Sequence, residues 1–159
     1  MIGSLKGYAK NEIMNSIICI DASFVLRTLL PGSYSDQALN LFEKWEQEKR
    51  TLIAPALLAF EVISSLRRIL YLKELTTHES EEVFERFLRM DIRLSSRRSI
   101  FPLAWSLAKE FNRPRAYDSA YLALASLADC DFWTADERLY NAVKDRLPWV
   151  KWIGSSSLV

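Results

Sequence analysis

The chain has 159 residues, of which half are hydrophobic and 26% are charged, and its formal net charge is +1. These values predict one soluble globular domain, and no apolar run reaches the ~20 residues that a membrane helix needs. Two cysteines are too few for a disulfide framework or a zinc site, so we expect Cys19 and Cys130 in the core and the chain in a reducing cytoplasm.

In chain order, residues 1–15 predict a flexible N-terminal extension without a signal peptide, and Met14 is a candidate natural start. Residues 16–159 then predict a single domain in which short apolar segments alternate with amphipathic ones. Strands are predicted at 16–21, 51–54, 91–94, 131–134 and 149–153. A further apolar segment at 22–30 follows the first strand. Helices are then predicted at 35–49, 55–75, 76–90, 98–111, 115–128 and 137–146. Ser35 or Asp36 would cap the first of these helices, Pro55 would be the first residue of the second, and Thr76 or Thr77 would cap the third. This alternation predicts an α/β fold with a mainly parallel sheet, in which ligands bind beyond the carboxyl ends of the strands.

The segment 115–128 predicts a helix that is apolar on nearly every face and is therefore buried. Its first turn carries Asp118, and no basic residue follows within the helix. A buried carboxylate without a cation costs several kcal/mol, and the helix N-terminus offsets only about 0.3–1 kcal/mol of this. Asp118 is therefore either a helix cap or a functional carboxylate.

Three further acids lie in similarly apolar surroundings. Asp21 and Asp136 follow predicted strands and would share one edge of the sheet, while Glu61 lies about two turns into a predicted helix. Taken singly, Asp21 and Asp136 could be helix caps, and Glu61 could pair with Arg67 or Arg68. Together, four gathered carboxylates would repel one another unless a cation were present, and their oxygens suit Mg²⁺ or Mn²⁺.

Elimination also favours metal-dependent chemistry at a phosphate. The single histidine, His78, lies in a charged helix away from the acids, so a Ser-His-Asp or Cys-His triad lacks its base. Neither a G-x-x-x-x-G-K-[ST] nor a G-x-G-x-x-G loop is present. A divalent metal can lower the pKa of water and stabilise charge that develops on phosphorus.

Four motifs resemble the PIN-domain ribonucleases, and within them the VapC-like toxins. The motifs are IDAS at 20–23, PALLAFEV at 55–62, YDSAYLALA at 117–125 and WTADERL at 133–139. The resemblance extends over about residues 17–153. It implies a three-layer α/β/α sandwich with a central parallel sheet, and single-stranded RNA as the substrate. It also implies a homodimer and a possible cognate antitoxin.

The resemblance implies roles for six residues. An Mg²⁺ or Mn²⁺ site would be formed by Asp21, Glu61, Asp118 and Asp136, and the hydroxyls of Ser23 and Thr134 would orient water or the acids. In this hypothesis Glu61 is a further ligand or a water-positioning base, and basic residues near Arg113 and Arg115 grip the RNA backbone.

The sequence leaves two other classes of function open. One is an RNA- or protein-binding module without catalysis, against which the four intact acids argue. The other is a phosphatase with Asp21 as nucleophile, which would place a second Asp where this chain has Ser23. Aromatic residues on amphipathic helices also predict an apolar interaction surface, because there are more of them than one core is expected to hold. These residues are Phe42, Trp45, Phe84, Phe87 and Trp105.

Overall fold

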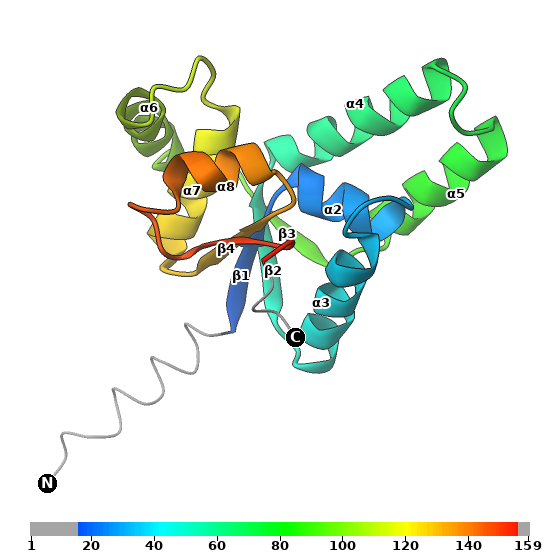
Figure 1. Cartoon of the computed structure of the whole chain (residues 1–159), viewed down its shortest axis with the longest axis horizontal. Coiled ribbons are helices and arrows are strands. Elements are labelled where there is room, and N and C mark those ends of the chain that lie inside the picture. Colours follow the sequence, from blue (N-terminus) through cyan, green and yellow to red (C-terminus); the bar gives the residue numbers. More distant parts are fainter. Residues whose placement is uncertain (1–15, 156–159) are drawn as a thin grey trace, which may run out of the picture.

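The computed structural model describes residues 16–155, so the predicted extension at 1–15 and the candidate start at Met14 lie outside the described residues. Five parallel strands form one sheet in the order β3-β2-β1-β4-β5 (Figure 1). The strands are β1 (Ile17–Ile20), β2 (Thr51–Pro55), β3 (Ile92–Ser95), β4 (Asp131–Thr134) and β5 (Val150–Trp152). Each strand of this sheet lies within one residue of its predicted range, and the α/β fold with a parallel sheet is confirmed.

Seven helices are present among the described residues. They are α2 (Ala22–Leu29), α3 (Ser35–Gln47), α4 (Leu57–Tyr71), α5 (Thr77–Leu88), α6 (Ile100–Glu110), α7 (Tyr117–Ala128) and α8 (Glu137–Val143). Helices α4 and α5 lie side by side and project from the sheet as an arm (Figure 1). Within residues 16–155, no helix is long and apolar enough to cross a membrane.

Helices cover both faces of the sheet, because successive side chains of a strand point to opposite faces. On β4, Phe132 stacks on Tyr121 of α7, at 6.0 Å between ring centroids. The next residue, Trp133, packs edge-on against Trp45 of α3, which in turn stacks on Phe24 of α2. The resulting layers are α7, the sheet, and α2 with α3, as the sandwich predicts.

The central helix α7 is buried as its apolar pattern predicts. Residues 121–125 are each at most 3% exposed, and α7 contacts β1, β2 and β4. Both cysteines are buried free thiols, as expected for core residues. The first turn of α7 lies near the edge where β1 and β4 end, because Asp118 in this turn is close to Asp21 at the end of β1.

Two expected helix starts are wrong. The N-cap of α3 is Tyr34, in the left-handed region at φ 64°, and the Ser35 hydroxyl instead donates to the carbonyls of Leu30 and Gly32. Pro55 is the last residue of β2 and not the first of a helix. A proline has no N–H to give the ladder, so it is tolerated at the end of a strand. By contrast, Thr76 forms a complete capping box with Glu79 at the start of α5.

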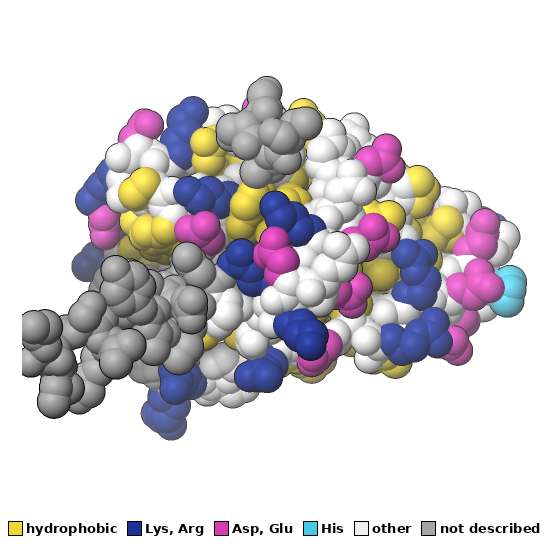
Figure 2. All heavy atoms as spheres, turned by 90° about the horizontal axis from the view of Figure 1, so that it is seen from below, with side chains coloured by type: hydrophobic (Ala, Val, Ile, Leu, Met, Phe, Trp, Pro, Cys, Tyr) yellow, Lys and Arg dark blue, Asp and Glu magenta, His cyan; other side chains and the backbone are white. Residues whose placement is uncertain are grey.

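Four of the five aromatic residues predicted to form an interaction surface pack in or against the core, so the prediction is wrong for them. Trp45 and Phe87 are buried, and Phe42 and Phe84 pack against the core. Trp105 is 68% exposed. Other large apolar side chains are exposed instead, among them Phe60 on α4 and Phe101 on α6. On the face shown in Figure 2, basic and acidic side chains are interspersed, in keeping with the small net charge.

Candidate functional site

Asp21 lies at the carboxyl end of β1 and is the N-cap of α2. Its Oδ1 accepts hydrogen bonds from the Phe24 N–H at 2.8 Å and the Ser23 hydroxyl at 2.6 Å, and the Thr134 hydroxyl donates to its Oδ2. The side chain is buried, and burial raises the pKa of Asp21 to about 6, against the hydrogen bonds that lower it. Asp21 is thus a fixed carboxylate with both oxygens bonded.

Ser23 and Thr134 connect the ends of β1 and β4. These strands are parallel neighbours, with Ile20 paired to Trp133, so their carboxyl ends meet. The two hydroxyl oxygens lie 3.2 Å apart. Ser23 Oγ accepts from the Ala135 N–H at 2.9 Å, and Thr134 Oγ1 accepts from the Asp136 N–H at 2.9 Å. Each hydroxyl thus donates a hydrogen bond to Asp21 and accepts one from a backbone N–H of the residues that follow β4. These hydrogen bonds fix the position of the Asp21 side chain.

Glu61 lies on α4 and is half-buried beside α7. The phenol of Tyr121 donates a hydrogen bond to Glu61 Oε2. Burial raises the pKa of Glu61, the Tyr121 hydrogen bond lowers it, and the charge of Asp118 raises it. Burial and the nearby Glu61 raise the pKa of Tyr121, so its hydroxyl remains protonated and donates. The alternative that Glu61 pairs with Arg67 or Arg68 is wrong, since both arginines are exposed and no described ion pair joins them to Glu61.

Asp118 lies in the first turn of α7, and its partner is a cation that precedes the helix. Arg113 Nη2 donates to Asp118 Oδ2 at 2.9 Å, with side chains 26% and 38% exposed respectively. Arg113 is therefore the cation that a carboxylate in an apolar helix requires, and it lies before α7 instead of within it. The cap alternative is wrong, because the N-cap is Ala116 and α7 has no side-chain cap bond. An ion pair this open to solvent contributes about 1 kcal/mol or less.

Asp136 is the N-cap of α8. Its Oδ1 accepts from the N–H groups of Arg138 and Leu139, at 2.9 and 3.1 Å. The cap alternative for Asp136 is therefore realised, as it is for Asp21. Capping occupies one oxygen of Asp136 and leaves the carboxylate charge in place.

Asp118 lies close enough to two of the other three acids to affect their ionisation. The charge of Asp118 raises the pKa of both Asp21 and Glu61, whereas Asp136 is not among the charges that shift either group. Like charges have this effect only at short range. The structure therefore brings together Asp21, Glu61 and Asp118 from β1, α4 and α7, with Ser23 and Thr134 beside Asp21.

The described residues are not arranged as a finished metal site. Within residues 16–155, no group of three or more His, Cys, Asp or Glu side chains is placed so as to hold one metal ion. The hydrogen bonds explain this, since Glu61 is turned to Tyr121 and Asp118 to Arg113. The donor set itself fits a hard divalent cation, because it consists of carboxylate oxygens. The ligand roles of the four acids stay predictions.

Sequence reasoning missed Tyr121 and the direct contact of Arg113. Tyr121 follows Asp118 by three residues, a spacing that places both on one side of a helix. A buried tyrosine hydroxyl usually has a hydrogen-bond partner, which is the signal that could have pointed to Glu61. The Arg113–Asp118 pair was harder to find, because it depends on the turn that joins α6 to α7.

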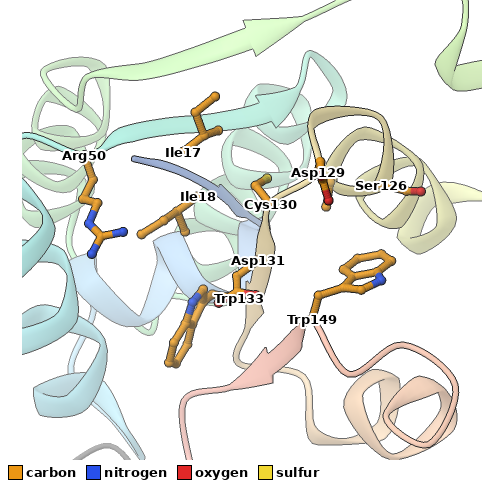
Figure 3. Close-up of a pocket in the computed structure, with 10 residues that line it drawn as sticks. Ile17, Ile18, Arg50, Ser126, Asp129, Cys130, Asp131, Trp133 and Trp149 are labelled. Carbon is orange, nitrogen blue, oxygen red and sulfur yellow. The ribbon is translucent and has the colours of Figure 1, made fainter. Parts of the chain in front are cut away.

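A pocket at the other end of the sheet contains none of the predicted site residues. It has a volume of about 510 Å³ and is lined by the amino ends of β1 and β4, with Arg50, Asp129 and Asp131 among its lining residues (Figure 3). In open parallel sheets, ligands bind beyond the carboxyl ends of the strands. The acids lie at that carboxyl edge, so we assign the chemistry there.

Comparison with known proteins identifies the family of this chain. The family model of the PIN domain matches residues 18–145. Ribonuclease VapC9 of Mycobacterium tuberculosis and a VapC ribonuclease of Mycobacterium bovis are each 26% identical over 132 residues, which cover 83% of this chain and 95% of the relative. The crystal structure of Mycobacterium tuberculosis VapC20, a sarcin-ricin loop cleaving toxin, is similar with a TM-score of 0.57 at 14% identity, over 79% of this chain and 95% of that one. Since the family model spans most of the sequence, the chain belongs to the PIN domain family.

Proposed function

We propose that this protein is a ribonuclease that hydrolyses phosphodiester bonds of single-stranded RNA, as the toxin of a toxin–antitoxin pair. The observation that carries the proposal is the meeting of Asp21, Glu61 and Asp118 at the carboxyl edge of a PIN-domain sheet. The relatives support it, because two are named as VapC ribonucleases and the structural neighbour is described as a sarcin-ricin loop cleaving toxin.

The site would hold Mg²⁺ or Mn²⁺ through Asp21, Asp118 and Asp136, with Glu61 as a further ligand or as the base that positions water. When bound, such an ion lowers the pKa of water and stabilises charge on the phosphate. The chain's own groups prepare the site. Ser23 and Thr134 hold the oxygens of Asp21 in one orientation, and Tyr121 holds Glu61.

Substrate contact would come from basic residues at the same edge of the sheet. Arg113 and Arg115 lie in the turn that leads into α7, next to Asp118. Contacts from arginine to phosphate position RNA without reading its sequence. This agrees with a net charge of only +1, because a few local cations suffice.

We also propose that the protein acts in the cytoplasm as a homodimer and binds an antitoxin. Exposed apolar side chains on α4 and α6 support an interaction surface, with Phe60 at 74%, Phe101 at 62% and Trp105 at 68% exposure. Light scattering at tens of micromolar should show a dimer. A strictly monomeric species under these conditions would contradict the dimer.

Cleavage of a labelled single-stranded RNA tests the function. The purified protein should cleave it with Mg²⁺ or Mn²⁺ and stop in EDTA, and the Asp21→Asn protein should not cleave. Cleavage that persists in excess chelator would remove the metal from the mechanism. RNA binding without cleavage under any divalent metal would favour the non-catalytic module. Hydrolysis of phosphomonoesters with RNA left intact would favour the Asp21 phosphatase, although Ser23 stands where that class needs a second Asp.

A further inference from the structure

The position of Arg113 is fixed by the turn between α6 and α7. Asn112 takes the left-handed conformation at φ 48°, and the Arg113 N–H donates to the Ala108 carbonyl at 2.8 Å. Pro114 follows and restricts the backbone of the residue before it. The turn therefore directs the Arg113 side chain to the first turn of α7, where it contacts Asp118.

The Arg113 guanidinium is only partly satisfied at this position. Arginine has five N–H donors in a planar fork. Nη2 donates to Asp118 Oδ2, while Nε is buried and has no hydrogen-bond partner within residues 16–155. A buried donor without a partner is unfavourable, so the site has an unused capacity to bind an acceptor. The fork matches the oxygens of a phosphate, which can accept two parallel hydrogen bonds.

We propose that Arg113 is the phosphate-binding residue of this site and that Asp118 holds its guanidinium while RNA is absent. The proposal rests on the proposed function and deepens it, since it selects Arg113 as the residue that binds phosphate. It also gives Asp118 a partner, Arg113, in addition to the proposed metal ion. The Arg113–Asp118 pair is partly exposed and therefore exchangeable. When a bound metal ion neutralises the charge of Asp118, the Arg113 guanidinium becomes available to a phosphate of the bound RNA.

Arg115 offers a matched control in the same turn. It has the same side chain and lies two residues away, but it is exposed and makes no described ion pair. If Arg115 bound phosphate as well, it would do so independently of Asp118. Coupling to Asp118 is therefore the property that distinguishes Arg113.

The test measures RNA binding in EDTA, where cleavage does not interfere. Fluorescence anisotropy with a labelled single-stranded oligoribonucleotide gives the dissociation constant of the wild type, Asp118→Asn, Arg113→Gln and the double variant. When Arg113 is present, we expect Asp118→Asn to tighten RNA binding about tenfold, because the guanidinium is released to bind phosphate. In the Arg113→Gln background the same substitution should tighten binding only about twofold, because it removes one negative charge and releases no guanidinium. In the Arg115→Gln background the gain should stay about tenfold. Arg113→Lys should give an intermediate gain, since it keeps the charge and loses the fork.

Equal gains in the Arg113→Gln and Arg115→Gln backgrounds would overturn the proposal. This result would show that Asp118 and Arg113 act as independent charges and that their contact only ties the turn to α7. Melting temperatures of all variants confirm that each one is folded. The readout needs no cleavage, so its failure is distinct from a failure of the ribonuclease function, which is measured with Mn²⁺.

Discussion

The two halves of the acidic site are built differently. In the half formed by β1 and β4, Asp21 is buried and receives hydrogen bonds from two hydroxyls and one backbone N–H. In the half formed by α4 and α7, Asp118 is 38% exposed and its described partner is the side chain of Arg113. The first half is fixed by groups of the fold itself, whereas the second depends on an ion pair that solvent weakens.

This difference indicates a division of roles. Groups that must keep one geometry are held by packing and by neighbouring hydrogen bonds. A carboxylate that must exchange one partner for another needs a contact that is easily replaced. We therefore expect the β1–β4 half to determine stability and orientation, and the α4–α7 half to respond to metal and RNA.

The largest expected effect is on cleavage, where both halves should be equally necessary. Asp21→Asn and Asp118→Asn should each reduce the rate by about a thousandfold or more, since each removes a charge that we propose to bind metal. Asp118→Asn should also keep the fold and should melt slightly higher in EDTA, because it removes a charge that disfavours the ionised forms of both Asp21 and Glu61. The increase in melting temperature that Mn²⁺ gives should shrink in this variant. Near-wild-type cleavage by Asp118→Asn would end its case as a metal ligand.

The next effect is a pH dependence of stability that belongs to the buried half. Folding raises the pKa of Asp21 from 3.8 to about 6, so the folded protein binds this proton more tightly than the unfolded chain. The resulting stabilisation is complete below the unfolded pKa and is lost as pH rises through the folded pKa. Without metal, the free energy of unfolding should fall by about 2 kcal/mol between roughly pH 4.5 and pH 7.5 because of this group.

Urea denaturation of the wild type and Asp21→Asn at both pH values, in EDTA, measures this contribution. The difference between the two proteins isolates Asp21 from the other titrating groups. Identical pH dependence in the two proteins would show that burial does not perturb Asp21 in this way.

A smaller effect is expected from the hydroxyl that joins the two strands. Thr134→Val keeps the side-chain shape but leaves the Asp136 N–H and Asp21 Oδ2 without this partner. It should lower the free energy of unfolding by about 1–2 kcal/mol and reduce cleavage about 10- to 100-fold. The control is Thr28→Val, another buried threonine, whose hydroxyl donates to the Val25 carbonyl of its own helix. Loss of stability with unchanged cleavage in Thr134→Val would show that this hydroxyl has no part in orienting the site.

The smallest expected effect is on metal binding in the half formed by α4 and α7. Arg113→Gln removes the cation that competes for Asp118, so Mn²⁺ should bind about three- to tenfold more tightly by isothermal titration calorimetry. Arg115→Gln is again the control, with a change of about twofold or less. Weaker Mn²⁺ binding to the Arg113→Gln protein would mean that the pair supports the metal site instead of competing with it.

The fold could be predicted from the sequence more fully than the site. Continuous apolar segments such as 17–20 indicated buried parallel strands, and the position of Asp21 directly after one placed it at the carboxyl edge of the sheet. The contacts of Asp118 and Glu61 could not be predicted, because they join residues of different elements. The Tyr121 hydroxyl reaches Glu61 across 60 residues of sequence, and the Arg113 contact depends on a left-handed residue in a turn. The spacing of these residues along the sequence therefore does not predict either contact.

The most direct test of the two-part site is a crystal structure of the protein with Mn²⁺, with the ion located by its anomalous scattering. We expect one anomalous peak, from an ion that both Asp21 and Asp118 coordinate, with the Arg113 guanidinium displaced from Asp118. A peak elsewhere, for example between Asp129 and Asp131 in the pocket at the opposite end of the sheet, would contradict it. So would the absence of a peak at an Mn²⁺ concentration that supports RNA cleavage.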